Sequence, residues 1–386
     1  MKKKITIFGS TGSIGISTLD IIKNNLDKYE VIGLSANNNF EKLLEQVNFF
    51  KPKVVSLNNR NSYKKFNELN RQKDLKILNG NDSYDEMLDF NTDLVMAAIT
   101  GAAGLMPVVS ALKKGVSIAL ANKESLVCSG SLITSIAEKN NAKILPVDSE
   151  HNAIYQVLDV KNRSKISKLI LTASGGPFFK VNKNNLKDVT PEEAIKHPNW
   201  SMGKKISIDS ATMMNKGLEL IEAHYLFNIP HNMIEVIIHP ESIIHSCVEY
   251  MDGSILSQMG TPDMRTPISY TLAYPERIKT NVQRLNLSEV GKLTFFKPDF
   301  NKYPCLELAY YSLKQKKSAP AILNAANEVA VDNFLRKKIK FLSIPKIVEK
   351  TLNKSSICNI NSIKDVMEID KESRNIASDI IKLGAY

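Results

Sequence analysis

Short apolar runs, each closed by a small or polar residue, recur through the first part of the chain. They are Lys4–Phe8, Tyr29–Ser35, Lys53–Leu57, Asp93–Ala97, Val116–Leu120 and Lys143–Pro146. Between them, apolar residues recur with helical spacing. Strand-length runs that alternate with helical segments predict a parallel sheet covered by helices on both faces. Ligands of such sheets bind beyond the carboxyl ends of the strands.

A different pattern follows in the rest of the chain. Strand-like runs predict a second sheet, and the last segment has the periodicity of amphipathic helices, which predicts a C-terminal helical bundle. The strands are expected at Lys165–Ala173, Ile234–Ile238, Ile243–Tyr250 and Ile255–Met259, and the helices at Ala321–Arg336, Ile344–Lys354 and Ile363–Leu383. We expect a doubly wound domain at 1–148, an α+β domain at 149–279, a linker at 280–303 and a helical domain at 304–386.

A long polar stretch lies inside the second predicted domain. Residues of about 174–205 have little periodicity and include Trp200, the only tryptophan of the chain. Loops of this length in a compact domain are often lids over a site. Trp200 either covers a ligand as part of such a lid or anchors the loop to the core.

Composition narrows the class of protein. The chain has 386 residues, 43% of them hydrophobic and 24% charged, which is typical of a globular protein with two or three domains. No apolar run approaches the roughly 20 residues of a membrane helix. Lys2–Lys4 resemble the start of a signal peptide, but Gly9 and Gly12 interrupt any apolar core. We expect a cytoplasmic protein; an organellar form without its transit peptide has the same pattern.

Charge and cysteine content argue against two further kinds of site. The net charge is +11, but the lysines are spread along the whole chain and no aromatic residues interleave with a basic stripe, so nucleic-acid binding is not expected. The cysteines lie far apart and form no Cys-x-x-Cys pair, which indicates buried thiols in a reducing compartment.

The first predicted strand leads into a glycine-rich turn. Gly9, Gly12 and Gly15 have the spacing Gly-x-x-Gly-x-x-Gly between a strand and a helix. This context favours a dinucleotide site in a Rossmann-like domain, because glycines allow close approach of pyrophosphate and the helix N-terminus presents free N–H groups. A turn without a ligand is the alternative.

The second predicted strand ends in Asn37, Asn38 and Asn39. Domains that prefer NAD place an acidic residue at this point to bind the ribose 2′-hydroxyl. The lack of an acid favours NADP, although the asparagines bring hydrogen-bond donors and no positive charge.

Two carboxylates follow the last strand of the predicted parallel sheet. Asp148 and Glu150 are two residues apart, so an extended backbone would place both side chains on one face. Oxygen ligands of this kind suit Mg²⁺ or Mn²⁺. Alone, such a pair is equally typical of a solvated loop. Asn122, Lys123 and Glu124 follow a neighbouring strand, and the shared edge of the sheet predicts one site.

Polar residues also begin a later helix. Ser210 and Thr212 are candidate caps, and Asn215, Lys216 and Glu219 follow with helical spacing. Hydroxyls, an amide and a lysine at a helix start are typical of a phosphate site. Glu219 lies one turn further and is placed to add a third carboxylate. A capped helix with an intrahelical ion pair is the alternative.

Together, these segments resemble the 1-deoxy-D-xylulose 5-phosphate reductoisomerase family. The similar stretches keep the family's order: Gly9–Gly15, Leu120–Leu126, Leu145–Ala153, Thr172–Phe178, His197–Gly203, Asp209–Glu222, Gly260–Pro267 and Asn324–Val331. The resemblance implies a homodimer that uses NADPH and a divalent cation, Mg²⁺ or Mn²⁺. It also implies conversion of 1-deoxy-D-xylulose 5-phosphate to 2-C-methyl-D-erythritol 4-phosphate in non-mevalonate isoprenoid synthesis.

The resemblance implies roles by position. Asp148, Glu150 and Glu219 match the metal ligands, and the two glutamates also border the substrate. Lys123 and Ser149 match contacts to the sugar hydroxyls, with Lys123 and Glu150 as candidate catalytic residues. Contacts to the substrate phosphate and backbone hydroxyls match Ser174, His197, Ser210, Asn215 and Lys216. Contacts to the cofactor match Thr11, Gly12, Ser13, Ile14, Asn37, Asn38, Asn39, Asn122, Glu124 and Gly203.

The implied chemistry is consistent with these residues. A cation chelated by the substrate carbonyl and a neighbouring hydroxyl polarises the carbonyl, which allows rearrangement to an aldehyde, and hydride from the nicotinamide then reduces it. Two other functions stay open from the residues alone. One is a different NADP oxidoreductase, such as a semialdehyde or homoserine dehydrogenase. The other is a non-catalytic NADPH sensor.

Overall fold

The structure is a computed structural model that describes residues 1–80, 82–200 and 202–386. Ser201, in the predicted lid loop, lies outside the described residues. The chain forms two units, which are Met1–Ser125 with Ile133–Ser149 and Met264–Val282, and Leu126–Leu132 with Glu150–Asp263 and Gln283–Tyr386. In the described part of the chain, no helix is long and apolar enough to cross a membrane.

The first unit contains a seven-stranded sheet with the order β4-β3-β2-β1-β5-β6-β7. All neighbouring strands are parallel. The strands are β1 (Lys3–Phe8), β2 (Tyr29–Ala36), β3 (Val54–Leu57), β4 (Lys76–Leu78), β5 (Leu94–Ala97), β6 (Ser117–Leu120) and β7 (Ile144–Pro146). Their continuous apolar runs suit strands that are buried on both faces. The predicted doubly wound, Rossmann-like fold is confirmed.

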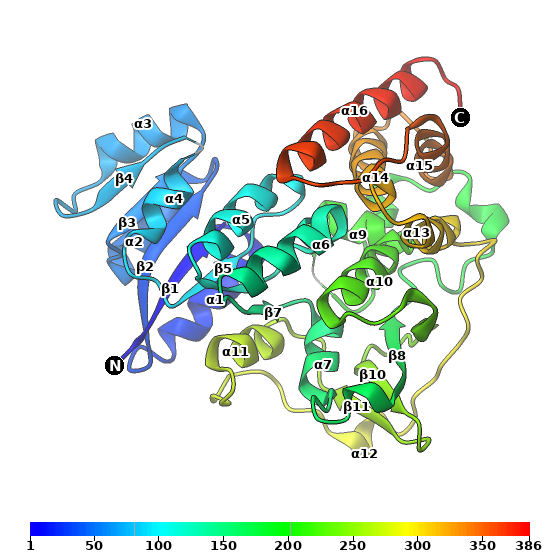
Figure 1. Cartoon of the computed structure of the whole chain (residues 1–386), viewed down its shortest axis with the longest axis horizontal. Coiled ribbons are helices and arrows are strands. Elements are labelled where there is room, and N and C mark those ends of the chain that lie inside the picture. The colour runs from blue at the N-terminus through cyan, green and yellow to red at the C-terminus, as the bar shows by residue number, and fades with distance from the viewer. Residues whose placement is uncertain (81, 201) are drawn as a thin grey trace. The chain divides into compact units, whose positions relative to one another are not determined.

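Helices alternate with these strands along the chain (Figure 1). They are α1 (Ser13–Lys23), α2 (Phe40–Phe50), α3 (Arg60–Leu69), α4 (Ser83–Leu88), α5 (Leu105–Lys113) and α6 (Lys123–Lys139). A later helix, α11 (Arg265–Ala273), also belongs to the first unit. Thr271 Oγ1 donates to the carbonyl of Pro146 at 3.1 Å, and Lys3 Nζ donates to Leu272 at 2.8 Å. These bonds attach a segment that the chain reaches only after the second sheet.

The second unit contains a four-stranded sheet with the order β11-β10-β8-β9. The strands are β8 (Ile166–Ala173), β9 (Ile234–Ile238), β10 (Ile244–Tyr250) and β11 (Ile255–Met259). β10 is antiparallel to both β8 and β11, whereas β8 and β9 are parallel. This is the second sheet that the sequence predicts, and β11 forms one of its edges.

Helices make up the rest of the second unit. They are α7 (Ser149–Val157, whose first residue belongs to the first unit), α8 (Pro191–Ala194), α9 (Lys204–Ala211), α10 (Met214–Phe227), α12 (Leu287–Val290), α13 (Pro304–Gln315), α14 (Ala319–Leu335), α15 (Ser343–Lys354) and α16 (Ile363–Lys382). α14 packs against α13, α15 and α16 (Figure 1). Its Ile322, Leu323 and Phe334 are almost fully buried. The predicted C-terminal helices are therefore confirmed.

Two contacts tie the bundle to the helices of the candidate site. A Cβ atom on Gly217 of α10 would lie 2.5 Å from Cβ of Ala309 on α13, so only glycine allows these helices to approach so closely. Asn327 of α14 donates through Nδ2 to the buried Asp209 of α9 at 2.8 Å. Asp209 also pairs with Lys205 at 2.8 Å. The bundle thereby fixes the positions of α9 and α10.

Candidate active site

The glycine-rich turn between β1 and α1 is shaped for close approach of an anion. Gly9 has φ +85°, and a Cβ atom on Gly15 would lie 2.5 Å from the Gly9 carbonyl oxygen. Gly12 precedes the helix and brings no side-chain cap to it. Thr11, Gly12, Ser13 and Ile14 are all at least partly exposed. Uncapped N–H groups and a cradle that a side chain would fill fit the pyrophosphate of a dinucleotide.

This turn lies where the strand order of the sheet reverses, since β2 and β5 flank β1 on opposite sides. The loop after β5 is fixed by Asn122, whose Nδ2 donates to Ile99 at 2.5 Å and to Gly101 at 2.8 Å. Asn122 Oδ1 accepts from the N–H of Ser125 at 2.8 Å and so caps α6. Asn122 is buried, and it shapes the switch point at which α/β sheets bind ligands.

The three asparagines after β2 form a tight connection to α2. Asn39 caps α2 by accepting from the N–H of Lys42 at 3.0 Å. The carbonyls of Asn37 and Asn38 accept from the N–H of Asn59 at 3.2 Å and from Ser62 Oγ at 2.8 Å. All three asparagines are exposed. Their backbones are therefore fixed, while the side chains of Asn37 and Asn38 face solvent.

Two other residues predicted to contact the cofactor lie on different elements. Glu124 is buried in the first turn of α6. Gly203 precedes α9 in the second unit, where it is exposed. A Cβ atom on Gly203 would meet open space, so its glycine is not required by local packing.

The predicted carboxylates do not share an extended backbone. β7 ends at Pro146 and α7 begins at Ser149, so the expectation that Asp148 and Glu150 continue a strand is wrong. Glu150 instead lies in the first turn of a helix, which favours an acidic side chain because the helix N-terminus carries partial positive charge. Asp148 precedes α7 and Glu150 lies in its first turn, so the two carboxylates meet at the start of the helix rather than along a strand.

Each predicted metal ligand is paired with a lysine. Lys123 Nζ lies 2.7 Å from Oδ2 of Asp148, and both side chains are nearly buried. Lys216 Nζ lies 2.7 Å from Oε1 of Glu150 and also bonds Glu219. Glu219 has 1% exposure and accepts a further bond from Asn215 Nδ2 at 2.5 Å. Carboxylates as buried as Glu219 require cations or donors, and these lysines provide them.

The three predicted metal ligands come together. Asp148, Glu150 and Glu219 each offer one carboxylate oxygen, and these oxygens all lie within 4.8 Å of one another. A donor set made only of carboxylate oxygens fits a hard divalent cation such as Mg²⁺ or Mn²⁺. A nitrogen-preferring or sulfur-preferring metal would find no suitable donors in this set.

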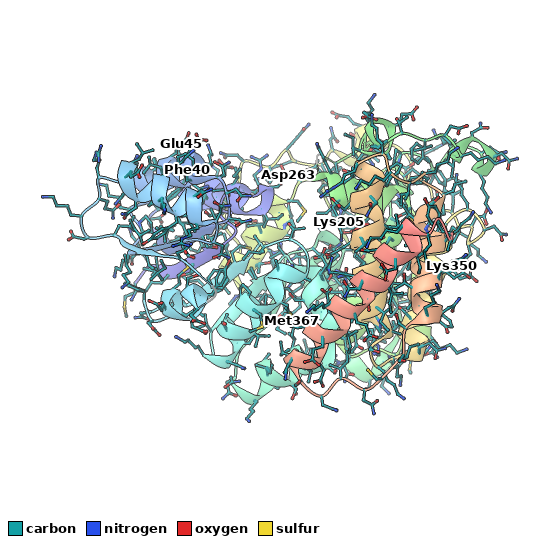
Figure 2. The ribbon with its side chains drawn as sticks, turned by 90° about the horizontal axis from the view of Figure 1, so that it is seen from above. Phe40, Glu45, Lys205, Asp263, Lys350 and Met367 are labelled. Atoms are coloured by element: carbon teal, nitrogen blue, oxygen red, sulfur yellow. The ribbon has the colours of Figure 1, made fainter. Side chains whose placement is uncertain are left out.

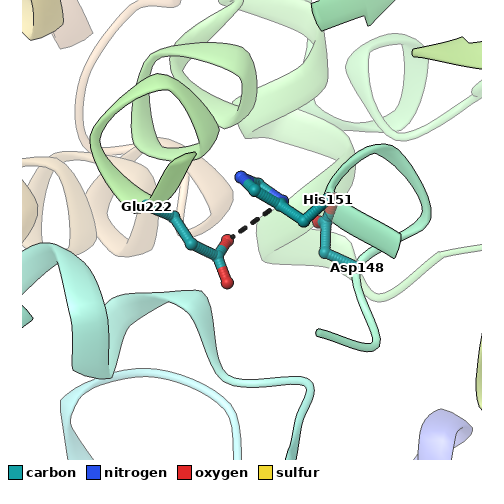
Figure 3. Close-up of side chains that lie close together, drawn as sticks. All are labelled: Asp148, His151 and Glu222. Atoms are coloured by element: carbon teal, nitrogen blue, oxygen red, sulfur yellow. Dashed lines mark ion pairs between the residues drawn. The ribbon is translucent and has the colours of Figure 1, made fainter. Parts of the chain in front are cut away.

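His151 and Glu222 form a buried pair next to Glu219 that the sequence analysis did not predict. His151 Nε2 lies 2.8 Å from the backbone carbonyl of Glu219, so this nitrogen donates a proton. Its Nδ1 lies 3.4 Å from Oε2 of Glu222 (Figure 3). Both side chains are almost completely buried. The spacing of Glu219 and Glu222, three residues apart on one helix, is the only sequence signal for this arrangement.

Ser174 and His197 form a hydrogen-bonded pair of defined tautomer. Nδ1 of His197 accepts from the N–H groups of Asn199 at 3.2 Å and Trp200 at 3.0 Å, so it carries no proton. Nε2 therefore donates to Ser174 Oγ at 2.9 Å. Burial lowers the pKa of His197 to about 4, which keeps the ring neutral. Ser174 also accepts from Gly176 at 3.1 Å, so its own hydroxyl proton is available to a ligand.

Ser210 does not cap the helix that was predicted to follow it. Ser210 belongs to α9 and does not cap the following helix; that position is taken by Met213, which has φ +61°. Thr212 Oγ1 accepts from Met214 at 3.3 Å, which is the one bond of the predicted cap that forms. The burial of Asp209 against α14 explains the difference, because it holds α9 helical through Ala211.

Trp200 is close to the turn between β9 and β10. Its ring centroid lies 6.0 Å from that of His245, and Asn199 Nδ2 donates to the carbonyl of Pro240 at 2.6 Å. Burial lowers the pKa of His245 to about 4, so both rings are uncharged. These contacts attach the Trp200 segment to the second sheet.

Comparison with known proteins extends these observations to a family. Models of the 1-deoxy-D-xylulose 5-phosphate reductoisomerase match residues 5–130, and models of its C-terminal domains match residues 144–227 and 259–376. The chain is 47% identical over 379 residues to the enzyme of that name from Trichlorobacter lovleyi, covering 98% of this chain and 97% of the relative.

Solved structures agree with the sequence comparison. One is the 1-deoxy-D-xylulose 5-phosphate reductoisomerase from Zymomonas mobilis in complex with NADPH, with a TM-score of 0.93, 46% identity and 99% of both chains covered. Another is a DOX-P reductoisomerase in complex with NADPH, fosmidomycin and magnesium, with a TM-score of 0.95 and 44% identity, covering 99% of this chain and 98% of that one. The chain belongs to the 1-deoxy-D-xylulose 5-phosphate reductoisomerase family.

Proposed function

We propose that this chain converts 1-deoxy-D-xylulose 5-phosphate to 2-C-methyl-D-erythritol 4-phosphate with NADPH and Mg²⁺ or Mn²⁺. Membership of the family makes it an NADP-dependent oxidoreductase. The observation that carries the proposal is the group of three carboxylates within 4.8 Å. Another dehydrogenase on a Rossmann-like domain has no need for such a group, because hydride transfer alone requires no divalent cation.

Asp148, Glu150 and Glu219 are the proposed ligands of the cation. When bound, the cation supplies Lewis-acid polarisation of the substrate carbonyl. Lys216 bonds Glu150 and Glu219, so its ammonium neutralises two of the three carboxylates. Lys123 does the same for Asp148 at 2.7 Å. The lysines thereby hold the carboxylates in position.

Lys123, Ser149 and Glu150 are proposed to bind the hydroxyl groups of the sugar. Lys123 and Glu150 are also the proposed proton donors and acceptors of the rearrangement. The positions of these residues support the assignment. Lys123 is the first residue of α6, which follows β6, and Ser149 and Glu150 are the first residues of α7, which follows β7. Both segments follow the carboxyl ends of parallel strands, where sheets of this kind carry out their chemistry.

Ser174, His197, Ser210, Asn215 and Lys216 are the proposed contacts of the substrate phosphate and backbone hydroxyls. Ser174 has a hydroxyl proton to donate, because its oxygen accepts from His197 and Gly176. His197 is neutral and oriented by two backbone N–H groups. Binding of the phosphate orients the reacting carbons, which lie at the other end of the substrate.

NADPH is proposed to bind at the carboxyl end of the seven-stranded sheet. The residues are those predicted from the sequence: Thr11, Gly12, Ser13, Ile14, Asn37, Asn38, Asn39, Asn122, Glu124 and Gly203. When bound, NADPH supplies the hydride that reduces the aldehyde. The glycine cradle and the uncapped start of α1 support this placement.

Further features of the proposal concern the organisation of the protein. Residues 174–205 are proposed to act as a lid. The proposed domains are 1–148, 149–279 and 304–386, with a linker at 280–303.

The four free cysteines support a reducing compartment, for which we propose the cytoplasm or an organelle. The homodimer is supported by β11, an edge strand on which Ile255 and Leu256 are 54% and 46% exposed.

The deciding experiment is oxidation of NADPH measured with 1-deoxy-D-xylulose 5-phosphate, with and without EDTA. We expect absorbance loss that requires substrate, stops on chelation and returns with Mg²⁺ or Mn²⁺. Activity that persists in EDTA with a semialdehyde would favour another NADP oxidoreductase. Binding of NADPH without oxidation by any sugar phosphate would favour a sensor.

A further inference from the structure

The end of β2 lacks the charge that an NADP site needs. The 2′-phosphate distinguishes NADPH from NADH, and Rossmann-like domains bind it near the carboxyl end of their second strand, commonly with an arginine. This chain has only the neutral Asn37, Asn38 and Asn39 at that point. Positive charge must therefore come from a neighbouring element if the site prefers NADPH.

The neighbouring strand ends level with β2. β2 and β3 pair in parallel, with Ala36 opposite Leu57. Beyond the strands, the N–H of Asn58 donates to the carbonyl of Ala36 at 3.2 Å, and the N–H of Asn59 donates to that of Asn37 at 3.2 Å. The next residue is Arg60, the first of α3.

The start of α3 is fixed against the asparagines. Asn59 caps α3 by accepting from Asn61 and Ser62, both at 3.0 Å. Ser62 Oγ in turn donates to the carbonyl of Asn38 at 2.8 Å. The backbone that carries Arg60 is therefore held directly beside the segment that follows β2.

Among the cations of α2 and the first turns of α3, Arg60 and Lys64 form no ion pair within the described residues, and Arg60 is the one at the first residue of α3, beside the segment that follows β2. Lys42 pairs with Glu45 at 2.7 Å, and Lys65 Nζ lies 5.5 Å from the ring centroid of Phe40, the first residue of α2 (Figure 2). Arg60 is exposed, and within the described residues its guanidinium has no ion pair or hydrogen bond. Glu41 and Glu45 are exposed acids of this region, and Glu45 is the partner of Lys42.

We propose that Arg60 binds the 2′-phosphate of NADPH and sets the preference for NADPH over NADH. The inference rests on the proposed function, since it assigns a residue to the cofactor of that reaction. A guanidinium presents parallel N–H groups that match two phosphate oxygens, whereas asparagine adds only neutral donors. The N-terminal end of the α3 helix dipole adds partial positive charge beside it. Arg60 thus replaces the charge that the asparagines do not provide.

Binding of nucleotide fragments tests the assignment without any turnover. Calorimetry compares 2′,5′-ADP with 5′-AMP on the full-length chain. We expect Arg60→Ala to weaken 2′,5′-ADP about ten- to a hundredfold, the effect of losing a charge-assisted hydrogen bond, and to leave 5′-AMP close to wild type. Arg71→Ala is the matched control, because Arg71 is an exposed arginine just beyond the other end of α3. It should bind both fragments as wild type does.

Kinetics supply the second measurement. The ratio of kcat/KM for NADPH to that for NADH should fall about ten- to a hundredfold in Arg60→Ala. Arg60→Lys should recover part of the ratio, because charge is restored without the paired N–H groups. An unchanged ratio in Arg60→Ala, or equal loss of both nucleotide fragments, would overturn the assignment.

The two proposals fail in different ways. If the wild-type chain oxidises no NADPH with 1-deoxy-D-xylulose 5-phosphate, the proposed function is wrong, but loss of 2′,5′-ADP binding in Arg60→Ala still supports the role of Arg60. If the enzyme is active and Arg60→Ala keeps its preference, only the role of Arg60 is overturned.

Discussion

Lys216 Nζ lies 2.7 Å from Oε1 of Glu150, and the same ammonium also bonds Glu219. A single buried lysine is therefore the common partner of two proposed metal ligands. The sequence resemblance assigns Lys216 to the substrate phosphate. The structure adds that the positive charge of Lys216 balances two of the carboxylates. Lys216 is therefore proposed to contact both the metal ligands and the substrate phosphate.

Replacement of Glu219 tests the metal site. Glu219→Gln removes one negative oxygen from the group, so we expect turnover to fall by more than about a hundredfold. Binding of 2′,5′-ADP should persist, because the residue is not part of the nucleotide site. Glu235→Gln is the control, since Glu235 lies at the surface of β9 and pairs with Lys168. Wild-type turnover in Glu219→Gln would contradict the three-carboxylate site.

Replacement of Lys216 tests the balance of charges. In Lys216→Met, Glu150 and Glu219 lose their cation, and we expect a loss of about 3–5 kcal/mol in the free energy of unfolding without metal. Added Mg²⁺ should raise the melting temperature of this variant more than that of wild type, because the metal binds only the folded state and replaces the lost charge. Equal shifts in thermal unfolding would show that the metal and the ammonium do not share these carboxylates.

Acid should destabilise the second unit through its buried histidines. Burial lowers the pKa of both His197 and His245 from the ordinary value of 6.5 to about 4. Between pH 4 and pH 6.5 the unfolded chain binds more protons at these histidines than the folded chain does. Their contribution to the free energy of unfolding is therefore fully present above about pH 6.5 and is lost as the pH falls towards 4. Each histidine adds a slope of at most about 1.4 kcal/mol per pH unit. Urea unfolding across this range should show a smaller slope in His197→Gln.

A charge on the edge strand should separate the subunits of the proposed homodimer. Leu256→Lys adds an ammonium to β11, where Leu256 is 46% exposed, and edge lysines oppose strand pairing. We expect sedimentation to report a monomer. Met367→Lys is matched in size and charge on α16, where Met367 is 44% exposed (Figure 2), and should remain dimeric. A dimeric Leu256→Lys would place the interface elsewhere.

The parallel sheet was predictable because its strands are continuous apolar runs, such as Lys4–Phe8, which only a fully buried strand requires. The family and its cofactors were predictable from motifs such as Asp209–Glu222. β4 was missed because Lys76–Leu78 is short and begins with an exposed lysine. A strand of this kind is formed by pairing with β3 rather than by its own pattern.

Local sequence patterns do not predict the backbone conformation where residues distant in the sequence determine it. Ser210 has the chemistry of a helix cap, yet it lies within α9 because Asp209 is held by Asn327 from α14. The pairing of His197 with Ser174 joins residues separated by a long loop, and no spacing rule anticipates it. Lys143–Pro146 likewise suggests an extended conformation that continues to Glu150, but α7 begins at Ser149.

The bond from Asn327 to Asp209 limits how far this protein can be shortened. A chain that ended before α14 would leave the buried carboxylate of Asp209 without its bond from Asn327. It would also leave α13, against which Gly217 of α10 packs, without its contact to α14. Glu219 lies on α10, so the support of its helix by α13 would be weakened. The C-terminal helices thus support the two helices, α9 and α10, on which proposed site residues lie.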